Sequence, residues 1–257
     1  MPLYKTNAAM ITLFRRLRQK LISSGSLTKY LLYALGEILL VVLGILIALQ
    51  INNWNEHQKR LLQETELLES FEVELGNTRG RLQNIVEYNL YTKEVIAELE
   101  EHLLDKRPYE ARLDSMFFIS TRFNFGDRFS TVALDNLNSY GIDIIRNKEL
   151  RNQIILTYEA YPYLKEAQNI YTDIILSAGK DLLNTRFVEL WDGDASNDDV
   201  TGTMHPLNYN ELLTDQEFLY FLRSLPNHMV YFVERPVEYT LTRIESSLQM
   251  IESELNK

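Results

Sequence analysis

One short segment has acidic and hydroxyl side chains at alternate positions, as a calcium-binding loop does. The four oxygen-bearing residues are Asp192, Asp194, Ser196 and Asp198. They match the first, third, fifth and seventh ligand positions of such a loop. The sixth position needs glycine for a sharp turn and is Asn197, while the twelfth needs a bidentate glutamate and is Thr203. Because both positions fail, we interpret the segment as a solvated acidic loop and assign no metal site.

The histidines do not form a recognisable metal or catalytic site. The chain has four of them, His57, His102, His205 and His228, and none has a second histidine or a cysteine at metal-ligand spacing. The sequence has no cysteine, glycine-rich phosphate loop, G-x-S-x-G turn or H-E-x-x-H helix. We therefore assign no catalytic, cofactor-binding or metal residue, and we expect no cofactor and no enzymatic activity.

An acidic residue, Glu37, lies inside a long apolar run. The run extends from Tyr30 to Ile51 and has one other polar interruption, Gln50. About 20 such residues cross the roughly 30 Å of hydrocarbon in a bilayer, so we predict a transmembrane helix over residues 30–52. The alternative, a cleaved signal peptide, would have a shorter apolar core and a small-residue cleavage site.

Glu37 shares one face of this predicted helix with mostly small residues. In steps of three and four, that face consists of Ala34, Glu37, Val41, Gly44 and Ala48. Small residues let helices approach closely in a membrane, and an acidic residue near the bilayer centre costs about 2.5–3.5 kcal/mol on insertion scales. We therefore interpret this face as a helix–helix interface, with a second copy or with another membrane subunit. In the alternative, Glu37 extends toward the headgroups near Tyr33.

Basic residues before the apolar run set the predicted orientation. Residues 1–29 carry six Lys or Arg side chains and no Asp or Glu, so the positive-inside rule places this tail in the cytoplasm and the chain after the span outside it. Part of the tail reads as a short amphipathic helix on anionic lipid, with its basic residues at Arg15, Arg16, Arg18 and Lys20. In the alternative, the tail is a disordered flank that only sets topology.

The chain after the apolar run is acidic. The formal net charge of the whole chain is −10 even though the tail is basic. This balance argues against nucleic acid as a partner, because phosphates attract Lys and Arg. The absence of cysteine excludes disulfides, so we expect the domain after the span to be stabilised by packing alone.

A seven-residue repeat follows the span and predicts a long helix over residues 53–107, ending before Pro108. The seam residues of this repeat are Leu61, Leu68, Phe71, Leu75, Leu82, Ile85, Asn89, Ile96, Leu99 and Leu103. Additional apolar residues widen the stripe, which favours packing in a bundle over an isolated two-stranded coil. Asn89 is the polar member of the seam, and we interpret it as a residue that sets register at a cost in stability.

Residues 108–257 have helical periodicity and no clear strand. We expect helices that begin after Asn147, at Thr214 through a capping box with Glu217, and near Pro236. The predicted fold is all-α. It consists of a single N-terminal transmembrane helix followed by an elongated helical bundle, in which the last helix closes back on a long coiled-coil-like helix.

Two stretches of the chain resemble a widespread uncharacterised family of bacterial single-span membrane proteins. The first is KYLLYALGEILLVVLGILIALQINNWNE, preceded by MITLFRRLRQKL, and the second is LDNLNSYGIDIIRNKELRNQII. The family has no assigned activity, so the resemblance implies a bacterial inner-membrane location and single-pass topology only. Family members tend to begin near the position of Met10, and nine residues precede it here.

These features favour an interaction protein with no catalytic activity: a scaffold, adaptor or accessory subunit of a membrane assembly. Its expected partners are membrane lipid, further copies of itself and another envelope membrane protein. One alternative is a ligand-sensing periplasmic bundle that signals through a partner chain. Another is a subunit of an ion-conducting membrane complex, for which Glu37 is the motivation.

Overall fold

The computed structural model describes residues 27–122, 129–193 and 201–257. The basic residues Arg15, Arg16, Arg18 and Lys20 lie outside these ranges, and so does most of the acidic loop after Asp192. The chain divides into two compact units, Met1–Leu62 and Gln63–Lys257, and each is described by itself.

Helix α2 extends over Leu27–Leu104 and contributes residues to both units. It contains no proline, so no residue along its 78 positions lacks the backbone N–H that the helix requires. It ends four residues before Pro108, and Lys106, just after the end, has a positive φ of 52°. A residue that precedes proline disfavours the helical region. The sequence predicts a helix up to residue 107, and α2 ends three residues earlier.

In the first unit, the described part of α2 is apolar and exposed. Every Leu, Ile and Val side chain from Leu31 to Ile51 is exposed. An 18-residue window of the helix has a mean hydropathy of 2.6, and none of that window is buried. By length and composition, this stretch is able to cross a membrane.

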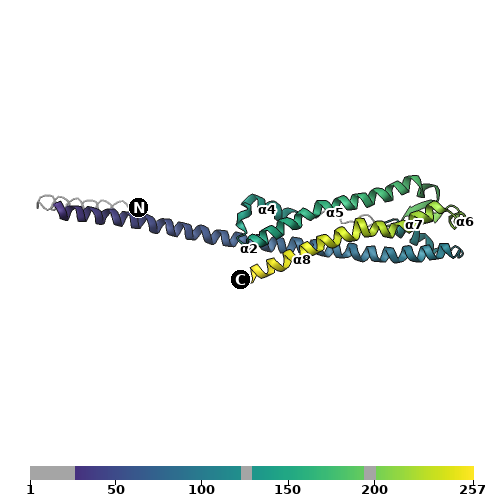
Figure 1. Cartoon of the computed structure of the whole chain (residues 1–257), viewed down its shortest axis with the longest axis horizontal. Helices are drawn as coiled ribbons and strands as arrows, with labels where there is room; N and C mark the ends of the chain where they lie inside the picture. The colour runs from purple at the N-terminus through teal and green to yellow at the C-terminus, as the bar shows by residue number, and fades with distance from the viewer. Residues whose placement is uncertain (1–26, 123–128, 194–200) are drawn as a thin grey trace. The chain divides into compact units, whose positions relative to one another are not determined.

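In the second unit, three long helices lie side by side (Figure 1): the remainder of α2, α5 (Lys148–Asp181) and α8 (Arg235–Leu255). The rings of Phe71 on α2 and Tyr158 on α5 lie 5.8 Å apart, and Asn89 of α2 donates a hydrogen bond of 2.8 Å to Glu234, which precedes α8. The shorter helical elements are α3 (Arg112–Ser120), α4 (Val132–Tyr140), η1 (Ile142–Ile144), η2 (Leu183–Thr185), α6 (Tyr209–Leu212), α7 (Gln216–Met229) and η4 (Val230–Glu234).

The heptad seam of α2 faces the interior of this unit. Its first residue, Leu61, belongs to the other unit and is half-buried. The buried seam residues are Leu68, Phe71, Leu75, Leu82, Ile85, Asn89, Ile96, Leu99 and Leu103. Because α5 and α8 bury their own apolar faces in the same core, the predicted all-α class of bundle is confirmed.

The expectation of no strand is wrong in one place. Residues Phe187–Trp191 form β1 and Gly202–Pro206 form β2, an antiparallel pair in which Phe187 lies opposite Pro206. A Cβ atom on Gly202 would lie 2.5 Å from the Leu190 carbonyl oxygen, so only glycine fits there. The hairpin packs through Phe187 against Phe117 of α3, with ring centroids 4.9 Å apart, and this tertiary contact stabilises strands too short to be recognised alone.

The C-terminal helices also differ in detail from the expectation. Asp215, and not Thr214, caps α7, because its carboxylate accepts from the backbone N–H groups of Glu217 and Phe218 at 3.1 Å each. Helix α7 then continues without a break through η4, a π-helical turn, into α8 at Arg235. The cap expected at Asn147 is confirmed, since its side chain accepts from the second and third residues that follow it.

Candidate functional site

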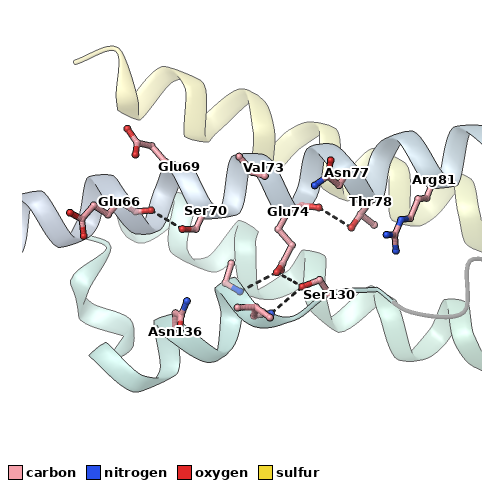
Figure 2. Close-up of a pocket in the computed structure, with 12 residues that line it drawn as sticks. Glu66, Glu69, Ser70, Val73, Glu74, Asn77, Thr78, Arg81, Ser130 and Asn136 are labelled. Atoms are coloured by element: carbon pink, nitrogen blue, oxygen red, sulfur yellow. Dashed lines mark hydrogen bonds between the residues drawn. The ribbon is translucent and has the colours of Figure 1, made fainter.

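A hollow with a volume of about 530 Å³ lies between α2 and α4 (Figure 2). Its lining combines three glutamates and one arginine with uncharged polar and small apolar side chains. The lining residues are Glu66, Glu69, Ser70, Val73, Glu74, Asn77, Thr78, Arg81, Ser130, Val132, Ala133 and Asn136. All of them lie in the second unit.

Glu74 is the central side chain of this hollow, and its carboxylate is occupied by the protein itself. It accepts a hydrogen bond of 2.5 Å from the Ser130 hydroxyl and one of 3.2 Å from the backbone N–H of Ala133. It also accepts from the hydroxyl of Tyr158 on α5. The carboxylate therefore caps the N-terminus of α4 from a different helix and joins α2, α4 and α5.

Burial raises the pKa of the Tyr158 hydroxyl far above its usual range, and its hydrogen bond to Glu74 raises that pKa further. The hydroxyl is therefore a donor to Glu74 at all ordinary pH values. Glu66 and Glu69 remain exposed at the rim of the hollow. Within residues 27–122, 129–193 and 201–257, no group of His, Cys, Asp and Glu side chains is arranged to hold a metal ion.

A second polar cluster joins α3 to β2. The buried carboxylate of Asp114 accepts from the Tyr109 hydroxyl at 2.7 and 2.8 Å and from Nδ1 of His205 at 2.7 Å. Burial, followed by the bond to Asp114, raises the pKa of Tyr109 to about 12. The other ring nitrogen, Nε2, lies 3.3 Å from the Thr203 hydroxyl, within hydrogen-bonding distance. All the polar atoms of His205 are thus used within the hairpin and α3.

Sequence reasoning did not find this cluster. The sequence pattern gives His205 no partner, because no second ligand lies at metal spacing, and the ring is half-exposed in the structure. Its partner Asp114 lies far away in the chain, so no local signal connects the two residues.

A third cluster contains Asn89, the polar residue of the predicted seam. Glu234 accepts from Asn89 and from the Lys93 ammonium, both at 2.8 Å and both at Oε1. The partner of Asn89 is thus a glutamate of the same chain, located at the end of the π-helical turn. Whether Asn89 also sets register between copies stays a prediction.

The predicted membrane face lies in the first unit. Ala34 and Glu37 are half-buried there, while Val41, Gly44 and Ala48 are exposed. Apart from the neighbouring residues and the backbone of its own helix, no atom of the described residues lies within 4 Å of the position that a Cβ on Gly44 would take. This open surface is compatible with a neighbouring helix, and its occupant stays a prediction.

The architecture defines a class: a helical bundle that shares its longest helix with an apolar stretch able to span a membrane. Residues 37–201 match a family of unknown function, DUF6090. Because the match covers more than half of the chain, the protein belongs to this family, and the resemblance to an uncharacterised family is confirmed. No curated protein and no solved structure matches the chain.

Proposed function

We propose that this protein is a membrane-anchored helical interaction protein: a scaffold, adaptor or accessory subunit of a bacterial inner-membrane assembly. One observation carries the proposal. From Leu31 to Ile51 every large aliphatic side chain of α2 is exposed, at a mean hydropathy of 2.6. Soluble monomers rarely expose apolar surface of this extent, so lipid is the partner that this stretch requires.

The orientation belongs to the same proposal. The basic tail lies in the cytoplasm on anionic lipid, and the acidic unit Gln63–Lys257 lies in the periplasm. Its acidic charge disfavours nucleic acid. The remaining partners are further copies of the chain and another envelope membrane protein.

The polar groups of the hollow support interaction over catalysis. A catalytic acid or base needs a free position beside a substrate, whereas Glu74 is occupied by Ser130, Ala133 and Tyr158. The polar side chains of the second and third clusters are likewise used to hold helices and strands together. They provide a rigid surface, which is what a scaffold needs.

The test is extraction of the full-length chain from its native membrane directly into lipid nanodiscs, followed by mass measurement of single particles. An assembly of several copies, or a complex with a second membrane protein in fixed ratio, is the expected result. A population of single copies at low micromolar concentration would contradict the proposal. A reporter that is active only outside the cytoplasm, fused after Lys257, should be active.

A ligand-sensing bundle is the second candidate, and the hollow between α2 and α4 favours it. Glu66 and Glu69 at its rim would select a cationic ligand. Thermal unfolding of the full-length chain with small organic cations tests this function, since a ligand that binds only the folded state raises the melting temperature. An unchanged melting temperature with every cation would exclude it.

A further inference from the structure

The outer face of η4 and α8 carries an alternating series of tyrosine and arginine side chains, Tyr231, Arg235, Tyr239 and Arg243, which we call the Tyr–Arg ladder. The Arg235 guanidinium lies over the Tyr231 ring at 4.5 Å, and that of Arg243 lies over the Tyr239 ring at 5.1 Å. Arg243 also donates to the Tyr239 hydroxyl at 3.1 Å. On the side of α5, the ring of Tyr163 packs edge-on against Tyr239 at 5.9 Å. The two guanidinium groups are thus held in defined positions before any partner arrives.

The charges of this ladder are not neutralised by the described part of the chain. Arg186 and Arg223, for example, both form ion pairs with carboxylates. Arg235 and Arg243 form none among the described residues, although Glu238 borders the same shallow hollow of about 650 Å³. In a chain with a net charge of −10, two fixed cations without carboxylate partners indicate a surface for an anionic partner.

Helix α2 carries an exposed surface of the opposite charge, which contains two glutamates. Glu87 and Glu94 are exposed, and neither takes part in an ion pair or hydrogen bond with any described residue. Leu90 and Tyr91 lie between them, 52% and 50% exposed. Glu87 and Glu94 are two residues before and five residues after Asn89, which places them about 150° around the helix from the side that meets Glu234.

The spacing of the two surfaces corresponds. Arg235 and Arg243 are separated by eight residues and Glu87 and Glu94 by seven, which is about 12 Å and about 10.5 Å along their helices. In each case an exposed aromatic side chain lies between the charges: Tyr239 on α8 and Tyr91 on α2. In copies that share one orientation in the membrane, α8 of one copy runs antiparallel to α2 of the other (Figure 1), and this alignment places charge against opposite charge and apolar surface against apolar surface.

We propose that the Tyr–Arg ladder of one copy docks on the Glu87–Glu94 surface of a second copy of this chain. The inference rests on the proposed interaction function and names its partner. The two surfaces lie on different helices and face different sides of the unit. One copy therefore uses both at once, and the contact is heterologous: it closes into a ring or continues as an array in the membrane.

The absence of cysteine from the chain makes a direct test available. One full-length variant carries Leu90→Cys and another carries Thr242→Cys, a position that lines the ladder hollow. After co-reconstitution in liposomes and mild oxidation, the mixture should give a disulfide-linked dimer. The matched control replaces Leu90→Cys by Val132→Cys, which is exposed on α4, and should give none. A mixture that gives no dimer, or as much dimer as the control, would overturn the proposal.

Charge reversal gives the second readout in the same cross-linking assay. Glu87→Arg with Glu94→Arg, or Arg235→Glu with Arg243→Glu, should each lower the cross-linked fraction, because like charges would meet; we expect about a tenfold loss of association. Both reversals together should restore it. If the combined reversals do not restore the cross-linked fraction, the contact between the Tyr–Arg ladder and the Glu87–Glu94 surface is contradicted. The broader interaction function fails separately, when the nanodisc particles contain neither several copies nor a second protein.

Discussion

Helix α2 has two regions that are rich in the same aliphatic residues and distribute them differently. From Leu31 to Ile51 they surround the helix, and all of them are exposed. From Leu68 to Leu103 they recur along one seam, and the seam is buried against α5 and α8. The comparison teaches that the angular distribution of apolar residues decides what a helix contacts. A helix that is apolar on all sides needs an apolar environment all round it, such as a bilayer, whereas an apolar stripe needs only neighbouring helices along one side.

The largest expected effect sharpens the buried side of this comparison. Leu75 is fully buried in the seam, and Leu75→Ala should lower the free energy of unfolding by about 2–5 kcal/mol. Val73, two residues away on the same helix, is 65% exposed. Val73→Ala should therefore change the free energy of unfolding by no more than about 0.5 kcal/mol. Urea unfolding of the full-length chain in detergent measures both values. Equal losses would mean that the seam is misassigned.

The next effect concerns the exposed apolar region from Leu31 to Ile51. Glu37→Leu should favour membrane insertion by about 2.5–3.5 kcal/mol, because it removes an acidic group from the apolar stretch. If its face contacts another helix, the same change should weaken association of the transmembrane helices. Gly44→Ile is the matched variant, since it should weaken association by steric clash and changes no charged group. An insertion assay and a transmembrane association assay separate the two effects, and association equal to that of the parent for both variants would mean that the face meets only lipid.

A smaller effect tests whether Glu74, a polar residue of α2 beside the apolar seam, stabilises the fold through its hydrogen bonds. Glu74→Leu leaves the hydroxyls of Ser130 and Tyr158 and the N–H of Ala133 without their acceptor, and we expect a loss of about 1–3 kcal/mol. Glu69→Leu, in the same hollow but exposed, is the control and should be nearly neutral. Comparable denaturation midpoints for the two variants would show that Glu74 has no structural role.

The smallest effect concerns the polar residue within the seam. Asn89→Leu removes one donor to Glu234 and keeps the other, Lys93, so the loss should be about 0.5–1.5 kcal/mol. A double-mutant cycle with Glu234→Gln isolates the coupling between the two side chains. A gain in stability would instead support the interpretation from sequence, in which a polar seam residue lowers stability to fix register.

Periodic features of the fold were predictable from the sequence. The apolar stretch and the seam of α2 follow from the spacing of aliphatic residues, and the end of α2 follows from Pro108. The cap at Asn147 follows from a local rule, because the residue and the N–H groups it satisfies lie within three positions. In each case the interaction is local or repeats at a fixed period.

The unpredicted features depend on residues that are distant in the sequence. The hairpin forms because Phe187 packs on Phe117, and the N-terminus of α4 is capped by Glu74 from another helix. Asp114 and His205 meet only after α3 and β2 are in place. No local pattern announces such contacts, so the clusters of the candidate site could not be identified from the sequence alone.

The π-helical turn η4 changes the spacing of the buried positions along the continuous helix formed by α7, η4 and α8. Before and after it, buried positions advance by alternating threes and fours, but through it they advance by four three times in succession, at Leu225, Met229, Val233 and Val237. An uninterrupted α-helix would rotate such a series off its buried side, and the wider turn absorbs the difference. Deletion of one residue from Val230–Glu234 would therefore turn everything that follows by about 100°. The core residues of α8 would then face water, and the Tyr–Arg ladder would lie on a different side of the protein.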